Sequence, residues 1–325
     1  MYFCTTTNPE KIRSFMINRE LIRLKIVQLV YAFYQNEGKT LDVAEKELIF
    51  SLDKAYDLYC HLLGLLVDLQ KMAERKNEAR IERDKRLKQE STGIFPDEKM
   101  ATNQFLLQLR ANTALLQYRE KQGDFWEEED AFVRKLYKSF TESDIFQLYL
   151  EKEDFSFEAD RELVRKLYKY LVCNNEDLDA VLEERSLYWN DDKEIIDSFV
   201  LKTIKRFTPE SDESQPLLPE YTSEEDRSYA TTLFREALTR SDEVRELIKQ
   251  GTKNWDFNRL AYMDVIIMQI ALTEILTFPS IPLSVSFNEY LDIAKVYSTP
   301  RSASYINGTM DHIVKQLKSE GKLLK

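Results

Sequence analysis

The side chains that could perform acid–base, nucleophilic or metal chemistry are few and scattered along the chain. His61 and His312 are the two histidines, and they lie in different regions of the sequence. The cysteines (Cys4, Cys60 and Cys173) are odd in number and show neither the pairing of a disulfide framework nor the spacing of a metal site. No two of the seven glycines have the spacing of a phosphate-binding or dinucleotide loop. The sequence therefore predicts no enzyme, no cofactor and no metal.

Three carboxylates near the most apolar stretch could be interpreted as a catalytic cluster. Asp264 and Glu274 are separated by apolar residues, and Asp256 precedes both. Helix capping, or pairing with Arg259 and other cations, explains all three more simply, so we expect them to be structural. Each histidine is likewise expected to be packed or at the surface.

Two regions of helical character must position the remaining polar residues. Residues 17–36 form a helix that is apolar on most sides, as expected for a buried helix, with Arg19 and Arg23 one turn apart near its start. Residues 255–310 begin with a long apolar helix that ends at Pro279 and Pro282. A second helix follows, and Pro300 fits the first turn of a third, with Thr299 as its cap.

The composition indicates an all-α protein, because seven Gly and eight Pro in 325 residues are too few for a β-rich chain with many turns. The longest apolar run is too short to cross a bilayer, and the amino terminus lacks a signal pattern, so we expect a cytoplasmic protein without membrane contact. The net charge of −11 comes from residues 91–254, which carry 23 basic and 36 acidic residues. We therefore expect nucleic acid to contact the flanking regions rather than this middle region.

Further helices are expected along the chain. Their predicted ranges are a very long helix from Asp42, then Met100–Gln122, Glu128–Phe140, Asp144–Glu151, Glu158–Cys173, Asp177–Glu184, Asp192–Phe207 and Glu224–Lys253. The mixed-charge run at 71–90 indicates an exposed helical extension stabilised by i,i+4 ion pairs, and an RNA-contacting arm is the alternative. The segment 208–226, with three prolines, is a linker or exposed loop. The first fifteen residues are expected to be a loose tail, and Met16 is a candidate natural start.

The middle region contains an internal repeat. The string VRKLYKSF at 133–140 returns as VRKLYKYL at 164–171. In addition, residues 160–189 align without gaps on residues 226–255, an offset of 66 that places Asp160 on Asp226 and Trp189 on Trp255. Similar capping and core preferences of amphipathic helices could explain such a match. The aligned tryptophans favour a partial duplication, which makes the middle region an inserted helical layer.

The carboxyl-terminal string resembles the NusB family of bacterial transcription antitermination factors. The matching residues are Trp255, Arg259, Leu260, Asp264, Ala271, Glu274, Ile281, Pro282, Val285, Asn288, Glu289, Ala294, Lys295, Tyr305, Ile306, Asn307, Gly308 and Asp311. The first helix also resembles the family, with Gln28 and Tyr31 in a Q-x-x-Y run. The resemblance covers about residues 17–70 and 224–315. It implies a NusB-like helical bundle of two subdomains with an inserted helical layer.

We therefore predict four segments. They are a tail at 1–16, an amino-terminal helical subdomain at 17–92, an acidic helical insertion at 93–222 and a carboxyl-terminal NusB-like subdomain at 223–325.

The same resemblance implies a function and a site. NusB proteins bind boxA RNA in nascent ribosomal transcripts together with NusE, a ribosomal small-subunit protein, and the complex acts on RNA polymerase against termination. By resemblance, the candidate RNA-binding residues are Arg19, Arg23, Gln28, Arg301, Ser302, Ser304 and Tyr305. Arg301 replaces an aspartate of several family members. Tyr31 is expected in the core, and Gly308 at a close approach of helices. The acidic insertion is a further candidate contact for NusE, which should be basic.

Two other interpretations arise from the same resemblance. The first is a scaffold that binds NusE but not RNA, because the insertion has displaced the RNA. The second is an RNA-modification module, since some ribosomal RNA methyltransferases carry a NusB-like domain. Those enzymes continue into a cofactor domain with a glycine-rich loop, whereas this sequence ends at Lys325, directly after the last NusB-like helix.

Overall fold

The computed structural model describes residues 18–36, 38–88, 92–219, 224–252 and 261–323. These residues form α-helices and contain no strand, which confirms the all-α prediction. The chain divides into two compact units, one formed by residues 55–220 and the other by residues 17–54 together with 221–325. The four segments predicted from the sequence stay a prediction. Among the described residues, no helix is long and apolar enough to cross a membrane.

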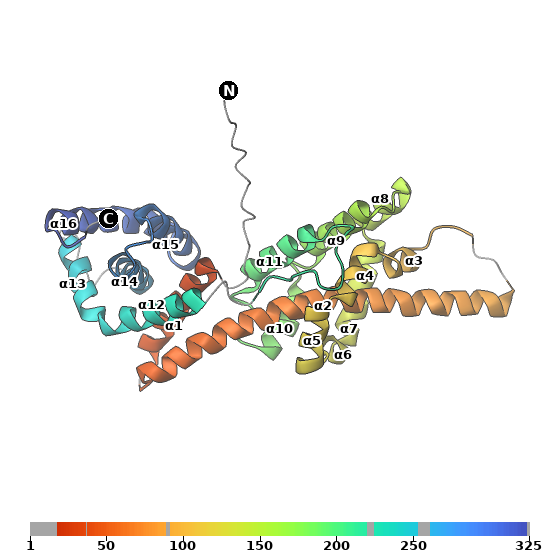
Figure 1. The fold of residues 1–325 in the computed structure, drawn as a ribbon, viewed down its shortest axis with the longest axis horizontal. Coiled ribbons are helices and arrows are strands. Elements are labelled where there is room, and N and C mark those ends of the chain that lie inside the picture. Colours follow the sequence, from red (N-terminus) through yellow and green to blue (C-terminus); the bar gives the residue numbers. More distant parts are fainter. Residues whose placement is uncertain (1–17, 37, 89–91, 220–223, 253–260, 324–325) are drawn as a thin grey trace, which may run out of the picture. The chain divides into compact units, whose positions relative to one another are not determined.

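The unit of residues 17–54 and 221–325 is built around one buried helix, α14 (Figure 1). Its helices are α1 (Arg19–Gln35), the start of α2 (Leu41–Leu87), α12 (Glu224–Thr239), α13 (Ser241–Gly251), α14 (Tyr262–Thr277), α15 (Leu283–Tyr297) and α16 (Ser302–Ser319). Helix α14 packs against α1, α12, α13, α15 and α16, so residues from Asp264 to Ile275 are all buried. This explains why α14 is apolar on every side.

The unit of residues 55–220 surrounds the second part of α2, which is buried from Ala55 to Ala73 except on one edge. Its other helices are α3 (Pro96–Ala101), α4 (Gln104–Ala111), α5 (Thr113–Gln122), α6 (Phe125–Glu128), α7 (Asp130–Glu142), α8 (Asp144–Lys152), α9 (Phe157–Leu171), α10 (Glu176–Arg185) and α11 (Lys193–Arg206). The hydroxyl of Tyr59 lies 2.6 Å from that of Thr203 and accepts the backbone N–H of Leu218 at 3.1 Å. These bonds attach α11 and the segment after it to α2.

The charged end of α2 is an exposed helical extension, as the sequence predicts. Side chains from Arg75 to Leu87 are mostly exposed, and ion pairs at i,i+4 join Arg80 to Asp84 at 3.9 Å and Glu82 to Arg86 at 3.1 Å. Such pairs stabilise a helix by only about 0.2–0.5 kcal/mol each.

Several predicted helix boundaries differ from the structure, in one case because side-chain caps start new helices. The single helix expected at Met100–Gln122 is three helices, since the side chains of Asn103 and Asn112 accept the backbone N–H groups of Leu106 and Leu115 and start new helices. The helical structure predicted from Glu224 to Lys253 consists of α12 and α13, which meet at Arg240. The last helix begins at Ser302, two residues after Pro300.

The internal repeat has a structural counterpart. Moved by 66 positions, the ranges of α9, α10 and α11 overlap those of α12, α13 and α14. Paired positions are buried in both copies, for example Leu167 with Leu233, Leu182 with Ile248 and Val200 with Ile266. Trp255 lies outside the described residues. The overlap supports a partial duplication of a three-helix segment.

The centre of the unit of residues 17–54 and 221–325 holds the fully buried carboxylate of Glu274 on α14. Three other helices donate hydrogen bonds to it. Arg23 on α1 donates to both of its oxygens, at 2.8 and 3.2 Å. The hydroxyls of Tyr229 (α12), Ser286 and Tyr290 (both α15) also donate to Glu274, the last two at 2.6 and 3.0 Å. Arg23 reaches Glu289 as well, at 3.3 Å. The carboxylate thus joins α14 to α1, α12 and α15.

This environment sets the pKa of Glu274. Burial by itself raises the pKa, but the hydrogen bonds and charge of Arg23, together with the hydroxyls of Ser286 and Tyr229, hold it below its ordinary value. Because the folded pKa is lower than the unfolded one, the interaction stabilises the fold at neutral pH. That stabilisation is lost as the pH falls through the folded pKa.

We expect Arg23→Ala to destabilise this unit by about 3–5 kcal/mol, because it leaves the Glu274 carboxylate buried without its cation. Arg240→Ala is the matched control: the Arg240 side chain pairs at 2.9 Å with Glu243, which is 57% exposed, so its loss should cost below about 1 kcal/mol. Urea unfolding at pH 7 measures both values. Equal effects of the two substitutions would contradict the central role of Glu274.

Two glycines allow a second test of the packing. The sequence predicts a close approach of helices at Gly308, but the structure has it at Gly251, where α13 approaches α16. A Cβ on Gly251 would lie 2.5 Å from Cγ1 of Ile313 on α16, whereas a Cβ on Gly308 would meet no atom within 4 Å. Gly251→Ala should therefore destabilise the protein by about 1–3 kcal/mol through overpacking. Gly308→Ala, inside α16, should stabilise it by about 0.5–1 kcal/mol through helix propensity. Thermal unfolding gives the sign of the change in unfolding temperature for each variant. The prediction fails if both changes have the same sign.

Candidate nucleic-acid interface

The seven candidate RNA-binding residues do not form one site. Arg19 and Arg23 lie at the start of α1 and belong to the acidic environment of the core. The guanidinium of Arg19 lies 4.8 Å above the ring of Tyr229 and pairs with Asp226, and Arg23 is 2% exposed. Arg23 thus has almost no surface to offer a ligand. Both cations are matched by carboxylates distant along the chain, and no local sequence signal indicates such pairing.

The start of α16 is fixed to the start of α14 through Asp264. The hydroxyl of Ser302 donates to this carboxylate at 2.9 Å, and the hydroxyl of Ser298 donates to its other oxygen. Ser302 is 2% exposed and therefore positions the segment from the interior. Its neighbours Arg301 and Ser304 are exposed, and Tyr305 is half-buried. Asp264 is thus structural, as expected, but its partners are serines, and Arg259 lies outside the described residues.

Gln28 is brought close to this segment by α15. Its side-chain amide donates to the hydroxyl of Tyr297 at 3.1 Å, and Tyr297 immediately precedes Ser298. Gln28 therefore connects through Tyr297, Ser298 and Asp264 to the start of α16. Four candidates thus lie together at 301–305, and Gln28 is linked to that segment only through Tyr297.

Tyr31, one turn after Gln28, is not in the core. It is 37% exposed because it lies on the solvent-facing stripe of α1 with Gln28 and Gln35. Its ring meets that of Tyr262, which is 40% exposed, at 5.9 Å with the planes at 60°. Tyr262 precedes Asp264 by two residues, so the tyrosine pair adjoins the start of α14. An exposed pair of aromatic rings is suited to stacking unpaired bases.

We name Gln28, Tyr31, Tyr262, Arg301, Ser304 and Tyr305 the polar rim. It combines one exposed cation, two exposed rings and several hydrogen-bonding groups around the ends of α14 and α16. The sequence-based prediction missed Tyr262, whose signal would have been an aromatic residue at the start of the apolar helix, two positions before Asp264.

Metal-ligating side chains do not cluster beside the rim in the described part of the chain. No group of three or more His, Cys, Asp or Glu side chains there could hold a metal ion. His61 is half-buried with its ring 5.0 Å from that of Phe125 and 5.4 Å from that of Trp189, and His312 is exposed. Both histidines therefore have the packed or surface positions expected of them.

Comparison with known proteins shows which family the chain resembles. The model of the NusB family matches residues 194–315. The chain is 41% identical over 99 residues to the transcription antitermination protein NusB of Salinibacter ruber, covering 30% of this chain and 62% of that protein. It is 39% identical over 99 residues to the protein of the same name from Koribacter versatilis, covering 30% of this chain and 68% of that protein. The alignment thus spans under two thirds of the Salinibacter protein. No solved structure matches. On this similarity, the chain belongs to the NusB family.

Proposed function

We propose that this chain is a transcription antitermination factor. It would bind boxA-type RNA of nascent ribosomal transcripts together with NusE and thereby act on the processivity of RNA polymerase. The relatives support the general role through their name. The observation that supports RNA binding is the polar rim, in which the exposed rings of Tyr31 and Tyr262 lie 5.9 Å apart and Arg301 is exposed beside the start of α16.

The rim has the two parts that recognition of single-stranded RNA requires. Arg301 supplies a cation for phosphate, and the tyrosine pair supplies faces for bases. Gln28 and Ser304 offer hydrogen bonds to base edges. Arg23 and Ser302, predicted as contacts, would act from the interior by fixing α1 and the start of α16. Arg19 would contribute little charge because Asp226 neutralises it.

A second candidate function is a scaffold that binds NusE without RNA. It is favoured by the acidic partners of the first-helix arginines, since Asp226, Glu274 and Glu289 remove the positive charge that this end of α1 would offer to phosphates. The acidic residues of the insertion would add a surface for a basic ribosomal protein. A scaffold of this kind would retain NusE affinity and show no salt-dependent affinity for RNA.

Fluorescence anisotropy with labelled boxA RNA, with and without NusE, tests the proposal. We expect Tyr262→Ala to weaken RNA binding about 5- to 150-fold, because loss of one stacked base costs about 1–3 kcal/mol. Arg301→Ala should lower the slope of log K against log salt by about 0.7, the value for one phosphate contact on a single strand.

Phe50→Ala and Arg227→Ala are the matched controls. Each removes an exposed aromatic or cationic side chain from the same unit but outside the rim, and each should leave RNA affinity unchanged. Absence of RNA binding at low salt, both alone and with NusE, would exclude the antitermination proposal and leave the scaffold.

A further inference from the structure

One face of α11 differs from the corresponding face of its repeat partner α14. At the offset of 66, three fully buried apolar residues of α14 correspond to three exposed cations of α11. The pairs are Met268 with Lys202, Ala271 with Lys205 and Leu272 with Arg206. Ile267 is fully buried as well, whereas its counterpart Leu201 is half-exposed.

The exposure of α11 arises because no later helix covers this face. Helix α14 precedes α15 and α16, which pack on it, whereas residues 207–219 after α11 form no helix. A face that loses its cover must become polar, but exposure does not require one sign of charge. All three replacements are nevertheless cations, in a region where acidic residues outnumber basic ones by 36 to 23.

Helix α9 lies antiparallel beside α11 and adds cations to the same surface. Near its start, Arg161 donates to the carbonyl of Phe207 at 2.5 Å, and after its end the carbonyl of Val172 accepts from Lys193 at 3.2 Å. Between these points, Lys166, Lys169 and Tyr170 are exposed, Tyr170 to 60%. The Lys169 amine lies 5.3 Å from the centre of the Tyr170 ring.

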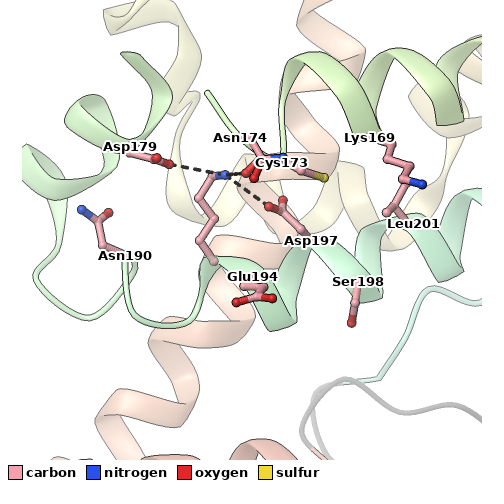
Figure 2. Close-up of a pocket in the computed structure, with 10 residues that line it drawn as sticks. Lys169, Cys173, Asn174, Asp179, Asn190, Glu194, Asp197, Ser198 and Leu201 are labelled. Carbon is pink, nitrogen blue, oxygen red and sulfur yellow. Dashed lines mark hydrogen bonds and ion pairs between the residues drawn. The ribbon is translucent and has the colours of Figure 1, made fainter. Parts of the chain in front are cut away.

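A pocket of about 510 Å³ shows that the two helices border one depression. Lys169 and Cys173 of α9 and its end line it together with Ser198 and Leu201 of α11 (Figure 2). Lys202 comes directly after Leu201, and Lys166 precedes Lys169 by one turn. We name the surface of α9 and α11 beside this pocket the α9–α11 groove and define it by Lys166, Lys169, Tyr170, Leu201, Lys202 and Lys205. Of these residues, Lys169 and Leu201 line the pocket itself.

Most cations of the groove are not matched by carboxylates. Glu162 pairs with Arg165 at 2.6 Å and Lys166 at 3.8 Å. Glu194, Asp179 and Asp197 lie at the pocket end, where the buried Lys193 pairs with Asp197 at 3.2 Å and Asp179 at 3.3 Å. Within the described part of the chain, no acidic side chain lies within 4.0 Å of the amines of Lys169, Lys202 or Lys205. The positive charge therefore lies at Lys169, Lys202 and Lys205, whereas the pocket end carries three carboxylates against Lys169 and Lys193.

The helix dipoles explain part of this pattern, since cations are favoured in the last turn of a helix. Lys169 and Lys205 occupy the last turns of α9 and α11. Lys166 and Lys202 lie before those turns, and an exposed tyrosine lies among them. Cations along a groove with an exposed aromatic ring are typical of surfaces that bind a single-stranded nucleic acid along its backbone.

We propose that the α9–α11 groove is a second RNA-binding surface, which contacts the phosphates of a single strand and stacks a base on Tyr170. The net charge of residues 91–254 predicts no nucleic-acid contact in this region. The exposed lysines of α9 and α11 nevertheless form a basic surface within it. This surface is separate from the polar rim, so it goes beyond the proposed function. An acidic protein segment is the competing ligand.

The test is the triple variant Lys169→Glu/Lys202→Glu/Lys205→Glu in the full chain, with a labelled, unstructured RNA of about two dozen nucleotides. If the three lysines contact phosphates, we expect RNA affinity to fall at least tenfold at low salt. The slope of log K against log salt should fall by about 2, at about 0.7 per contact. Tyr170→Ala should weaken binding with the slope unchanged.

The control is Lys121→Glu/Lys138→Glu/Lys152→Glu, which changes the net charge equally at exposed positions of α5, α7 and α8. An equal loss of RNA affinity in both triple variants would show a general effect of net charge and would overturn the proposal that the groove binds RNA. The proposal would also be overturned if the native chain bound no RNA, or if the groove variant bound RNA as well as the native chain does. A polyglutamate peptide serves as the acidic protein ligand: if the groove variant loses binding to this peptide but not to RNA, the groove binds protein instead. Arg301→Ala distinguishes the two surfaces. If this variant loses RNA affinity while the groove variant does not, the polar rim is the RNA-binding surface and the groove is not.

Discussion

The unit formed by residues 17–54 and 221–325 depends on the buried carboxylate of Glu274. A charge in the interior is tolerated only when its partners satisfy it completely, and here the donors come from α1, α12 and α15. One side chain thus connects four helices by hydrogen bonds. The interaction therefore specifies how these helices assemble around α14, beyond what apolar burial would require.

The same interaction determines which residues remain at the surface. By drawing Arg23 into the core and leaving Arg19 beside Asp226, it removes the charge of the first two candidate arginines. Asp264 performs a related role at the other end of α14, where the hydroxyls of Ser298 and Ser302 fix the start of α16. Tyr31, Tyr262 and Arg301 remain exposed.

The unit of residues 55–220 shows what happens to a repeated helical segment without its covering helices. Positions that are buried in the core of one unit have buried counterparts in the other, as at Leu167 and Val200, because each copy packs into a core of its own. The opposite face of α11, which has no counterpart of α15 and α16 upon it, has become basic and exposed. A region that is acidic as a whole can therefore carry a basic surface.

The sequence by itself determined the helical class, the family, the long α2 helix and the repeat, because each of these rests on composition, periodicity or strings of residues in order. It also identified Asp264 and Glu274 as structural, since carboxylates within apolar stretches are more simply explained as partners of nearby donors. It misplaced Tyr31 and Gly308, because burial and close approach depend on contacts between distant segments. It also predicted one helix at residues 100–122, where the caps Asn103 and Asn112 start new helices. Only the tertiary structure decided that Arg23 lies inside while Tyr262 and Lys202 lie outside. The reason is that a helix shows its own polar and apolar faces in sequence, whereas the neighbours that cover each face come from elsewhere in the chain.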